Sequence, residues 1–279
     1  MRQQGGQAAL DFYDRHPISE AQVMAALRRR GRLVGATLAP DELFEFDQDH
    51  YGGVAAVDTL ARRAGVVAGS RVLDVCAGLA GPARVLASRR GCHVVACELN
   101  QTRAAGGARL TRLVGLDGRI VIVRGDARTL PFGARSFEAC LSQEGLLHVD
   151  DKAAVLAECH RVLGDGGRLA FTDWVAHPRL GERERERLWH WMAATTLQTL
   201  DGYRTLLGRA GFRGIEAEDV SVEWRVIVRG RRARFRAERA DIVATLGETR
   251  WGEYDQLLAF FVGLVEDGKL GGGRFTATR

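Results

Sequence analysis

The chain has 279 residues, 46% of them hydrophobic, and a formal net charge of +5. This length accommodates one large core with a covering part. With no apolar run of about 18 residues and no apolar leader, we expect a cytoplasmic protein without a membrane partner. The cysteines are odd in number and lack metal-ligand spacing, so we expect buried thiols and no metal site; they are Cys76, Cys92, Cys97, Cys140 and Cys159.

Residues 1–56 are predicted to form an N-terminal helical extension. Ser19 and Gln22 make a capping box for a helix that runs to Arg30, and Pro40 is well placed to open a further helix. Near the end of this extension, residues 47–53 read Asp-Gln-Asp-His-Tyr-Gly-Gly.

Residues 72–98 are the most informative stretch and predict a nucleotide-binding βαβ unit. An apolar strand ends near Asp74, and the chain turns through Gly78 and Gly81 into a helix. A second apolar strand then ends in Glu98, 20 positions beyond Gly78, where an acid typically binds ribose hydroxyls.

The residues around the glycine turn indicate which nucleotide is bound. A dinucleotide site accepts a pyrophosphate at this turn and favours glycine at all three fingerprint positions. Here Cys76 takes the first position, and Asp74 lies two residues before it. A carboxylate would repel a diphosphate but suits a ligand with an ammonium group and a sulfonium. The pattern therefore favours S-adenosylmethionine over NAD.

The same alternation continues along the chain. Asp126 follows the third strand, placed to accept a hydrogen bond from the adenine amino group. The fourth strand delivers Ser142–Val149 to the carboxyl edge, where ligands of open α/β sheets bind. The predicted elements are a helix over 101–114, strands over 119–124 and 137–141, a helix over 152–163 and, after a turn at 164–167, a strand over 168–174.

In this order the motifs resemble those of the class I S-adenosylmethionine-dependent methyltransferases. Within that class the chain is similar to the sarcosine/dimethylglycine and phosphoethanolamine N-methyltransferases, which also carry an N-terminal Asp-Gln-x-His-x-Gly-Gly element. The resemblance covers roughly residues 46–175 and departs from the family pattern at Cys76 and Ala80. Ala80 costs little if its φ is negative and destabilises the turn if its φ is positive; we expect it to be tolerated. The matching segments are 72–75, 78–82, Glu98, 125–127, 142–149 and 163–169.

The resemblance implies a Rossmann-like, seven-stranded, doubly wound α/β sheet whose last strand is antiparallel and forms a hairpin with the sixth. Residues 57–180 would form the cofactor-binding core, and 181–279 the rest of the same sheet. In this last part we predict helices from 182 to 192 and from 202 to 210, a sixth strand near 212–220, a helical insertion over about 220–270 and a closing strand over 273–278.

The insertion could fold over the carboxyl edge as a cap that binds the methyl acceptor. Alternatively, its aromatic residues pack its own core or a dimer contact, and the sequence leaves a homodimer open. Its arginine cluster, 229–236, could pair with phosphates, but the acids that follow favour a solvated helix face, so we expect no nucleic-acid partner. The aromatic residues are Trp224, Phe235, Trp251, Tyr254, Phe260 and Phe261.

The resemblance implies a site for S-adenosylmethionine, whose product is S-adenosylhomocysteine, with Gln48 and Tyr51 as lid residues over the methionine tail or the acceptor. The acids have structural alternatives: Asp74 and Glu98 could cap helices, and Asp126 could simply occupy a loop. The expected cofactor-binding residues are Asp74, Ala77, Gly78, Gly81, Glu98, Leu99, Asp126, Ala127, Ser142, Gln143, Gln48 and Tyr51.

Methyl transfer is an in-line displacement that requires alignment and exclusion of water, and no metal. Three residues near the predicted site, His148, Glu144 and His50, are candidates for a base. His148 could instead cap a turn, and Glu144 could neutralise a cationic acceptor or the cofactor ammonium. The remaining histidines have no supporting partners and are treated as structural or solvated; they are His16, His93, His160, His177 and His190.

We therefore expect methyl transfer to a small-molecule acceptor, with an amine nitrogen implied by the resemblance alone. The first alternative is O- or C-methylation of a secondary metabolite. A nicotinamide dehydrogenase, disfavoured by Asp74 and Cys76, and a non-catalytic RNA-binding module are the remote alternatives.

Overall fold

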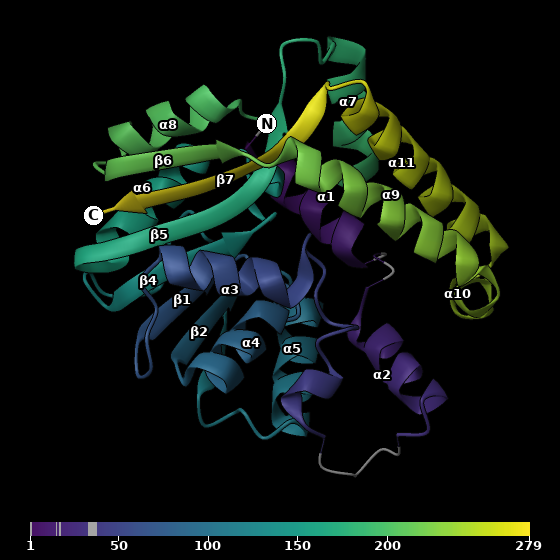
Figure 1. The fold of residues 1–279 in the computed structure, drawn as a ribbon, viewed down its shortest axis with the longest axis horizontal. Coiled ribbons are helices and arrows are strands. Elements are labelled where there is room, and N and C mark those ends of the chain that lie inside the picture. The colour runs from purple at the N-terminus through teal and green to yellow at the C-terminus, as the bar shows by residue number, and fades with distance from the viewer. Residues whose placement is uncertain (1, 15, 17, 33–37) are drawn as a thin grey trace.

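The computed structural model describes residues 2–14, 16, 18–32 and 38–279, and Figure 1 shows their arrangement. Seven strands form one sheet in the order β3-β2-β1-β4-β5-β7-β6. All neighbouring pairs are parallel except those of β7, which runs antiparallel to both β5 and β6. The predicted seven-stranded sheet with an antiparallel last strand is thus confirmed. The strands are β1 (Arg71–Val75), β2 (His93–Glu98), β3 (Ile120–Arg124), β4 (Phe137–Gln143), β5 (Leu163–Ala176), β6 (Arg213–Asp219) and β7 (Leu270–Thr278).

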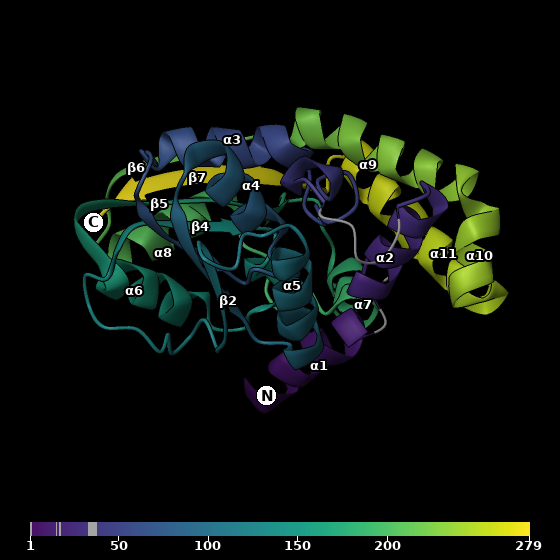
Figure 2. The same cartoon turned by 90° about the horizontal axis from the view of Figure 1, so that it is seen from below.

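The sheet is covered on both faces because successive residues of a strand point to opposite sides. In β1, Val72 joins the core under α3 and α4, while Leu73 joins the core under α6 and α8. Figure 2 shows these two helical layers on either side of the sheet. The helices of the sheet are α3 (Gly53–Arg63), α4 (Gly81–Arg90), α5 (Gln101–Leu113), α6 (Lys152–Val162) and α8 (Leu200–Arg209), whereas α7 (Glu182–Met192) packs with helices of the insertion between β6 and β7.

The boundaries follow most of the predictions closely; β7 begins three residues earlier than expected, at Leu270, and the largest difference is at β5. The glycine-rich segment 164–167 was expected to be a turn before the strand. It lies instead inside β5, where the register against β4 shifts between Phe137 and Ala139. The extra residues form an irregular start to a long strand, and they leave the carboxyl edge unchanged.

The N-terminal part packs beside the sheet. α1 (Arg2–Asp14) has no counterpart in the sequence prediction, whereas α2 (Glu20–Arg29) is capped as expected by the Ser19 hydroxyl, which accepts from the N–H of Gln22. Pro40 opens η1 (Pro40–Glu42), a single 3₁₀ turn.

The insertion between β6 and β7 is helical, as expected. It forms α9 (Ser221–Ala237), α10 (Arg239–Leu246) and α11 (Glu248–Glu266). Trp224 and Phe261 of these helices pack on Trp174 at the carboxyl end of β5. The insertion therefore lies over the carboxyl edge of the sheet, to the right in Figure 1.

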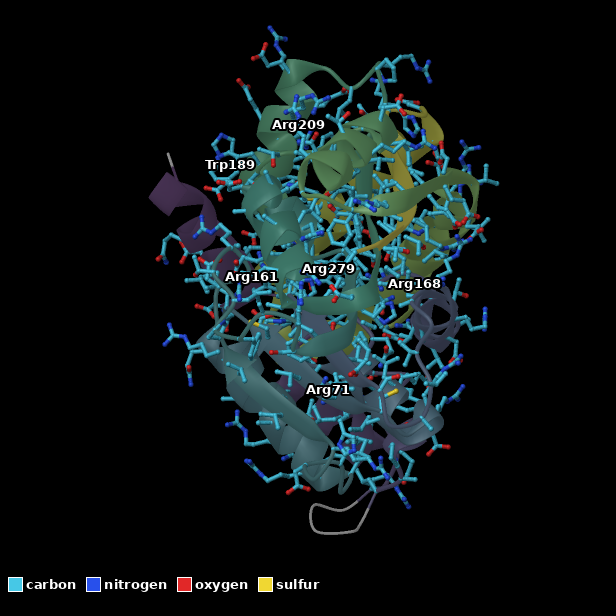
Figure 3. The ribbon with its side chains drawn as sticks, turned by 90° about the vertical axis from the view of Figure 1, so that its left-hand side faces the viewer. Arg71, Arg161, Arg168, Trp189, Arg209 and Arg279 are labelled. Atoms are coloured by element: carbon cyan, nitrogen blue, oxygen red, sulfur yellow. The ribbon has the colours of Figure 1, made fainter. Side chains whose placement is uncertain are left out.

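Arginines are distributed over the opposite edge, which Figure 3 faces. The labelled residues come from separate elements, and several pair with acids: Arg71 with Glu138 at 2.8 Å and Arg161 with Glu158 at 2.7 Å. Because these arginines come from separate elements and are partly neutralised by acids, they reflect the arginine-rich composition of the chain and do not form one basic patch. Among the described residues, no helix combines the length and apolarity needed to cross a membrane.

Candidate active site

Two adjoining cavities lie at the carboxyl edge. The Glu98 cavity, of about 80 Å³, lies beside the ends of β2 and β3. The cap cavity, of about 110 Å³, lies under α9 and α11. The same residues line both cavities where they meet, so these side chains form the boundary between them: Tyr13, Cys76, Gly78, Arg103, Gly145 and His148.

The Glu98 carboxylate is fixed by backbone donors. Its two oxygens accept from the N–H groups of Gly78 and Asn100, each at 2.8 Å. Burial raises the pKa of Glu98. Asn100 itself caps α5 by accepting from the N–H of Arg103, so Glu98 is not the cap of that helix. Leu99 and Ala127 line the same cavity.

Asp126 lines the Glu98 cavity but is engaged by a neighbour. Arg128 lies 2.7 Å from its carboxylate and also reaches Asp150 at 2.9 Å. The Arg128 guanidinium lowers the pKa of Asp126. Asp126 is therefore anionic and held in place, with Arg128 as a partner that the sequence analysis did not identify.

The turn between β1 and α4 has a strained backbone. Cys76, Gly78 and Ala80 have φ angles of 58°, 57° and 59°. The expectation that Ala80 is tolerated is corrected by this positive φ, because a side chain in the left-handed region costs about 1–2 kcal/mol. Both positions that depart from the family pattern are therefore strained, and the turn that carries them forms the floor of the cavities.

Asp74 lies at the start of this turn and lines the cap cavity, as do Ala77 and Gly81. Its side chain is 2% exposed, and among the described residues its Oδ2 atom has no hydrogen-bond partner. Burial, together with the charge of Glu98, raises the pKa of Asp74 to about 7. A buried carboxylate oxygen without a partner is costly unless a ligand supplies a donor.

The segment 47–53 lies against the glycine turn, and we call it the lid segment. A Cβ atom at Gly81 would lie 2.3 Å from the Asp47 carbonyl oxygen, so only glycine allows this approach. Asp47 also pairs at 2.8 Å with Arg84, and both side chains are fully buried. His50 links the lid to β4, with Gln143 at 2.9 Å on one ring nitrogen and Gln48 at 2.7 Å on the other.

Three of the expected site residues from this region, Gln143, His50 and Tyr51, line the cap cavity. Gln48 and Ser142 line neither cavity. Gln48 is directed to His50 and to the Asp47 carboxylate, and the Ser142 hydroxyl donates to the Val75 carbonyl at 2.8 Å.

His148 lies on the boundary between the cavities, in the 3₁₀ turn η2 (Leu146–His148). Its Nδ1 lies 3.3 Å from the Ala193 carbonyl, which can only accept, so in the neutral ring Nδ1 carries the proton. Its Nε2 therefore accepts from the Tyr13 hydroxyl at 2.8 Å. Burial lowers the pKa of His148 to about 4, so the ring is neutral at physiological pH.

Glu144 lines the cap cavity with its backbone in the left-handed region, at a φ of 49°. Its carboxyl oxygens accept from the Thr172 hydroxyl at 2.5 Å and the Tyr51 N–H at 2.6 Å. Burial raises the pKa of Glu144 to about 8. It therefore holds a proton at neutral pH and connects the lid segment to β5.

The expectation that His16 lacks partners was wrong. It is buried, lines the cap cavity, and accepts at Nδ1 from the Ile18 N–H at 3.1 Å. Its other nitrogen lies 3.0 Å from the Tyr254 hydroxyl, and the Asp49 carboxylate lies 3.7 Å away. No local pattern links residues 16 and 254, which only the tertiary fold brings together.

The arginine cluster on α9 is not uniformly solvated. Arg229 is exposed and pairs with Glu266 at 2.5 Å, as expected for a solvated face. Arg231 instead lines the cap cavity and donates to the carbonyls of Asp49 at 2.9 Å and His50 at 3.0 Å. Its guanidinium lies 4.5 Å from the centre of the Tyr51 ring. This arginine joins the insertion to the lid segment.

The aromatic residues of the insertion lie in two different environments. Tyr254 and Phe261 line the cap cavity together with Leu257 and Leu258. Phe235 and Trp251 instead stack on each other with ring centres 5.9 Å apart. Within the described part of the chain, no group of histidine, cysteine or acidic side chains could hold a metal ion.

Comparisons with known proteins agree with this arrangement. Residues 73–171 match the family model described as a methyltransferase domain. The chain is 32% identical over 165 residues to the glycine/sarcosine/dimethylglycine N-methyltransferase of Actinopolyspora halophila, a match that covers 59% of this chain and 29% of that protein. It is 32% identical over 176 residues to the methyltransferase GfsG of Streptomyces halstedii, covering 62% and 63%. The chain thus spans less than two thirds of these relatives.

Among solved structures, the fold is similar to that of phosphoethanolamine N-methyltransferase 2 of Haemonchus contortus in complex with phosphomonomethylethanolamine and S-adenosylhomocysteine. The TM-score is 0.78 at 22% identity, and the match covers 96% of this chain and 60% of that one. At this identity the likeness concerns the fold alone.

Proposed function

We propose that the protein transfers a methyl group from S-adenosylmethionine to a small-molecule acceptor. The premise is that residues 73–171 match a methyltransferase domain and that the chain has the class I S-adenosylmethionine-dependent fold. The observation that carries the proposal is the pair of buried acids, Asp74 and Glu98, at the ends of adjacent parallel strands, each lining one of two joined cavities. No dinucleotide would favour Asp74 beside its pyrophosphate.

The carboxyl edge offers the groups that a nucleoside with a cationic tail requires. Glu98 would bind the ribose hydroxyls, with Leu99 and Ala127 beside the base and Asp126 near its amino group. Asp74, whose Oδ2 lacks a partner among the described residues, would bind the ammonium group. The Glu98 cavity would thus take the nucleoside, and the cap cavity would hold the methionine tail of the cofactor together with the acceptor.

When bound, S-adenosylmethionine supplies an electrophilic methyl group whose C–S bond breaks as the lone pair of the acceptor forms the new bond. The protein has to align the partners and exclude water, and with a phenol or hydroxyl acceptor it also has to remove a proton. His148 fits the last role because its neutral ring has a basic Nε2 at the boundary of the cavities, held by the Tyr13 hydroxyl. In that role the Tyr13 oxygen would take the acceptor's proton as the Tyr13 hydroxyl proton moves to Nε2 of His148.

Glu144 and His50 fit supporting roles. At neutral pH Glu144 keeps its proton and ties the lid segment to β5, and His50 is engaged at both ring nitrogens. Both line the cap cavity, so they shape the acceptor site and can hydrogen-bond to it. Among the three candidates, His148 is therefore our choice for the base.

An amine nitrogen is our first choice of acceptor, supported by the similarity to the Actinopolyspora enzyme. A second candidate, an O- or C-acceptor with an apolar body, is favoured by the composition of the cap cavity. Its lining includes the apolar side chains of Leu147, Met192, Leu257, Leu258 and Phe261 and the large aromatic ring of Trp174. Incubation with labelled methyl donor and a panel of amines, phenols and carboxylates distinguishes the two candidates.

Calorimetric titration of S-adenosylhomocysteine against NAD tests the cofactor assignment. We expect binding of the first ligand only. Asp74→Asn and Glu98→Ala should each weaken it about 10- to 100-fold, the effect of one charged hydrogen bond. Asp117→Asn, at an exposed acid in the turn before β3, is the matched control. Unchanged affinity in both site variants, or preferential binding of NAD, would contradict the proposal.

A further inference from the structure

Two buried atoms of opposite charge lack partners at the cap cavity. Among the described residues, neither Oδ2 of Asp74 nor Nε of Arg103 has a hydrogen-bond partner. Asp74 is 2% exposed and Arg103 is 5% exposed, and both line this cavity. Leaving a buried charged group without its full set of hydrogen bonds is costly, so each atom indicates a missing partner.

Arg103 is held firmly apart from this one nitrogen. One terminal nitrogen donates to the Ile18 carbonyl at 3.0 Å, and the other to the Asp49 carboxylate at 3.0 Å. The guanidinium also lies 4.5 Å from the centre of the Tyr13 ring. These contacts engage both terminal nitrogens, and Nε is the guanidinium nitrogen that has no partner among the described residues.

The position of Arg103 relates it to the cofactor rather than to the acceptor. It lines both cavities at their boundary, directly against the glycine turn. A Cβ atom at Gly78 would lie 2.9 Å from one of its terminal nitrogens and 3.5 Å from Nε. A ligand that runs from the Glu98 cavity into the cap cavity crosses the boundary that Gly78 and Arg103 both line.

We infer that Arg103 binds the α-carboxylate of the cofactor's methionine moiety, while Asp74 binds its ammonium group. This inference rests on the proposed function and adds a residue to it. The tail of the cofactor is an α-amino acid, with one positive and one negative group on the same carbon. A buried site for such a zwitterion needs one side chain of each sign, or the unmatched charge would be buried without compensation.

Removing one charge from the ligand tests this directly. S-adenosylhomocysteine and its decarboxylated analogue, which keeps the ammonium group, are titrated by calorimetry against the full chain and against Arg103→Met. We expect the variant to bind S-adenosylhomocysteine about 10- to 100-fold more weakly. The affinity of the variant for the decarboxylated analogue should differ from that of the parent by less than about threefold. Arg109→Met, at an exposed residue of the same helix that pairs with Glu20, should leave the affinity for both ligands unchanged.

A structural role of Arg103 as the anchor of Asp49 would give a different pattern, in which both ligands weaken equally; that result would overturn the inference. If Arg103→Met does not fold, Arg103→Lys is measured in the same way, since it keeps the charge beside Asp49 but has no Nε donor. An unchanged affinity ratio between the two ligands would then contradict the inference. Failure of the parent chain to bind either ligand would instead reject the proposed function.

Discussion

The hydroxyl of Tyr13 lies 2.8 Å from Nε2 of His148, although 135 positions separate the two residues. The hydrogen bond joins α1 to the turn after β4, on the boundary between the two cavities. Because Nδ1 donates to the Ala193 carbonyl, the ring orientation is fixed and the unprotonated Nε2 faces the Tyr13 hydroxyl. The base we propose is therefore completed by a residue from the N-terminal helix.

Replacing this base should affect turnover more than cofactor binding. We expect His148→Asn to lower the rate of methyl transfer about 100-fold or more, the usual contribution of a positioned general base. Tyr13→Phe, which keeps the imidazole but not its partner, should cost about 10-fold. Single-turnover assays with labelled donor measure both effects, and affinity for S-adenosylhomocysteine should stay within about threefold.

His160→Asn serves as the control for these two variants, because His160 packs on Phe212 away from both cavities. A His148→Asn variant with normal turnover would show that the imidazole only holds the turn.

Glu144 should make the free energy of unfolding fall as pH rises. Its folded pKa of about 8 lies above the ordinary value of 4.5, so between these pH values the folded chain holds a proton that the unfolded chain has released. In that window the group destabilises the fold by on the order of 1 kcal/mol per pH unit. Urea unfolding of Glu144→Gln between pH 5 and 8 should therefore show a stability, relative to the parent, that increases with pH.

Glu138→Gln is the control of opposite sign, because the hydrogen bonds from Arg71 lower the pKa of Glu138. The ionised form of Glu138 stabilises the fold, and this stabilisation is lost only as pH falls. The stability of Glu138→Gln relative to the parent should therefore not rise between pH 5 and 8. If the difference in unfolding free energy between Glu144→Gln and the parent does not change with pH, Glu144 is ionised at neutral pH.

The Asp47–Arg84 pair should be strongly coupled because both side chains are fully buried. Asp47→Ala leaves an unpaired buried guanidinium and should cost about 3–5 kcal/mol of unfolding free energy. In a double-mutant cycle with Arg84→Met, we expect a coupling energy above about 2 kcal/mol. The exposed pair Arg71–Glu138 should give less than about 1 kcal/mol in the same measurement. Equal coupling in the two cycles would refute the role of burial.

Glycine at position 81 is required by the close approach of the lid segment. Gly81→Ala places a methyl group 2.3 Å from the Asp47 carbonyl oxygen and should cost about 2–4 kcal/mol. Gly118→Ala, where a Cβ meets nothing within 4 Å, should be close to neutral. Thermal unfolding of the two variants checks this contrast, and equal melting temperatures would contradict it.

The positions of Asp74 and Glu98 at the carboxyl edge of the sheet could be predicted from the sequence because the signals are local. Asp74 and Glu98 each end an apolar strand, and parallel strands bring such ends to one edge. The lining of the cap cavity could not be predicted in this way, since His16 and Tyr254 are 238 positions apart and meet only after the insertion has folded back. Nor does the sequence reveal the sign of φ at Ala80, which depends on how the turn is packed.

Arg231 should control the mobility of the lid segment. Arg231→Met removes two hydrogen bonds to the carbonyls of Asp49 and His50, so we expect faster hydrogen exchange over residues 47–53. The KM for the acceptor should rise about 10-fold, with a smaller change in affinity for S-adenosylhomocysteine. Arg229→Met, two residues earlier on the exposed face, is the control. Unchanged exchange in the Arg231 variant would disprove the connection.

Both ends of the insertion attach to neighbouring strands. α9 begins at Ser221, just after β6, and α11 ends at Glu266, just before β7, which pairs with β6. The two attachment points therefore lie side by side on paired strands, and the hydrogen bonds of Arg231 hold the insertion to the lid segment. A rotation of the insertion about these two attachment points would open the cap cavity to a substrate or product without separating any pair of strands.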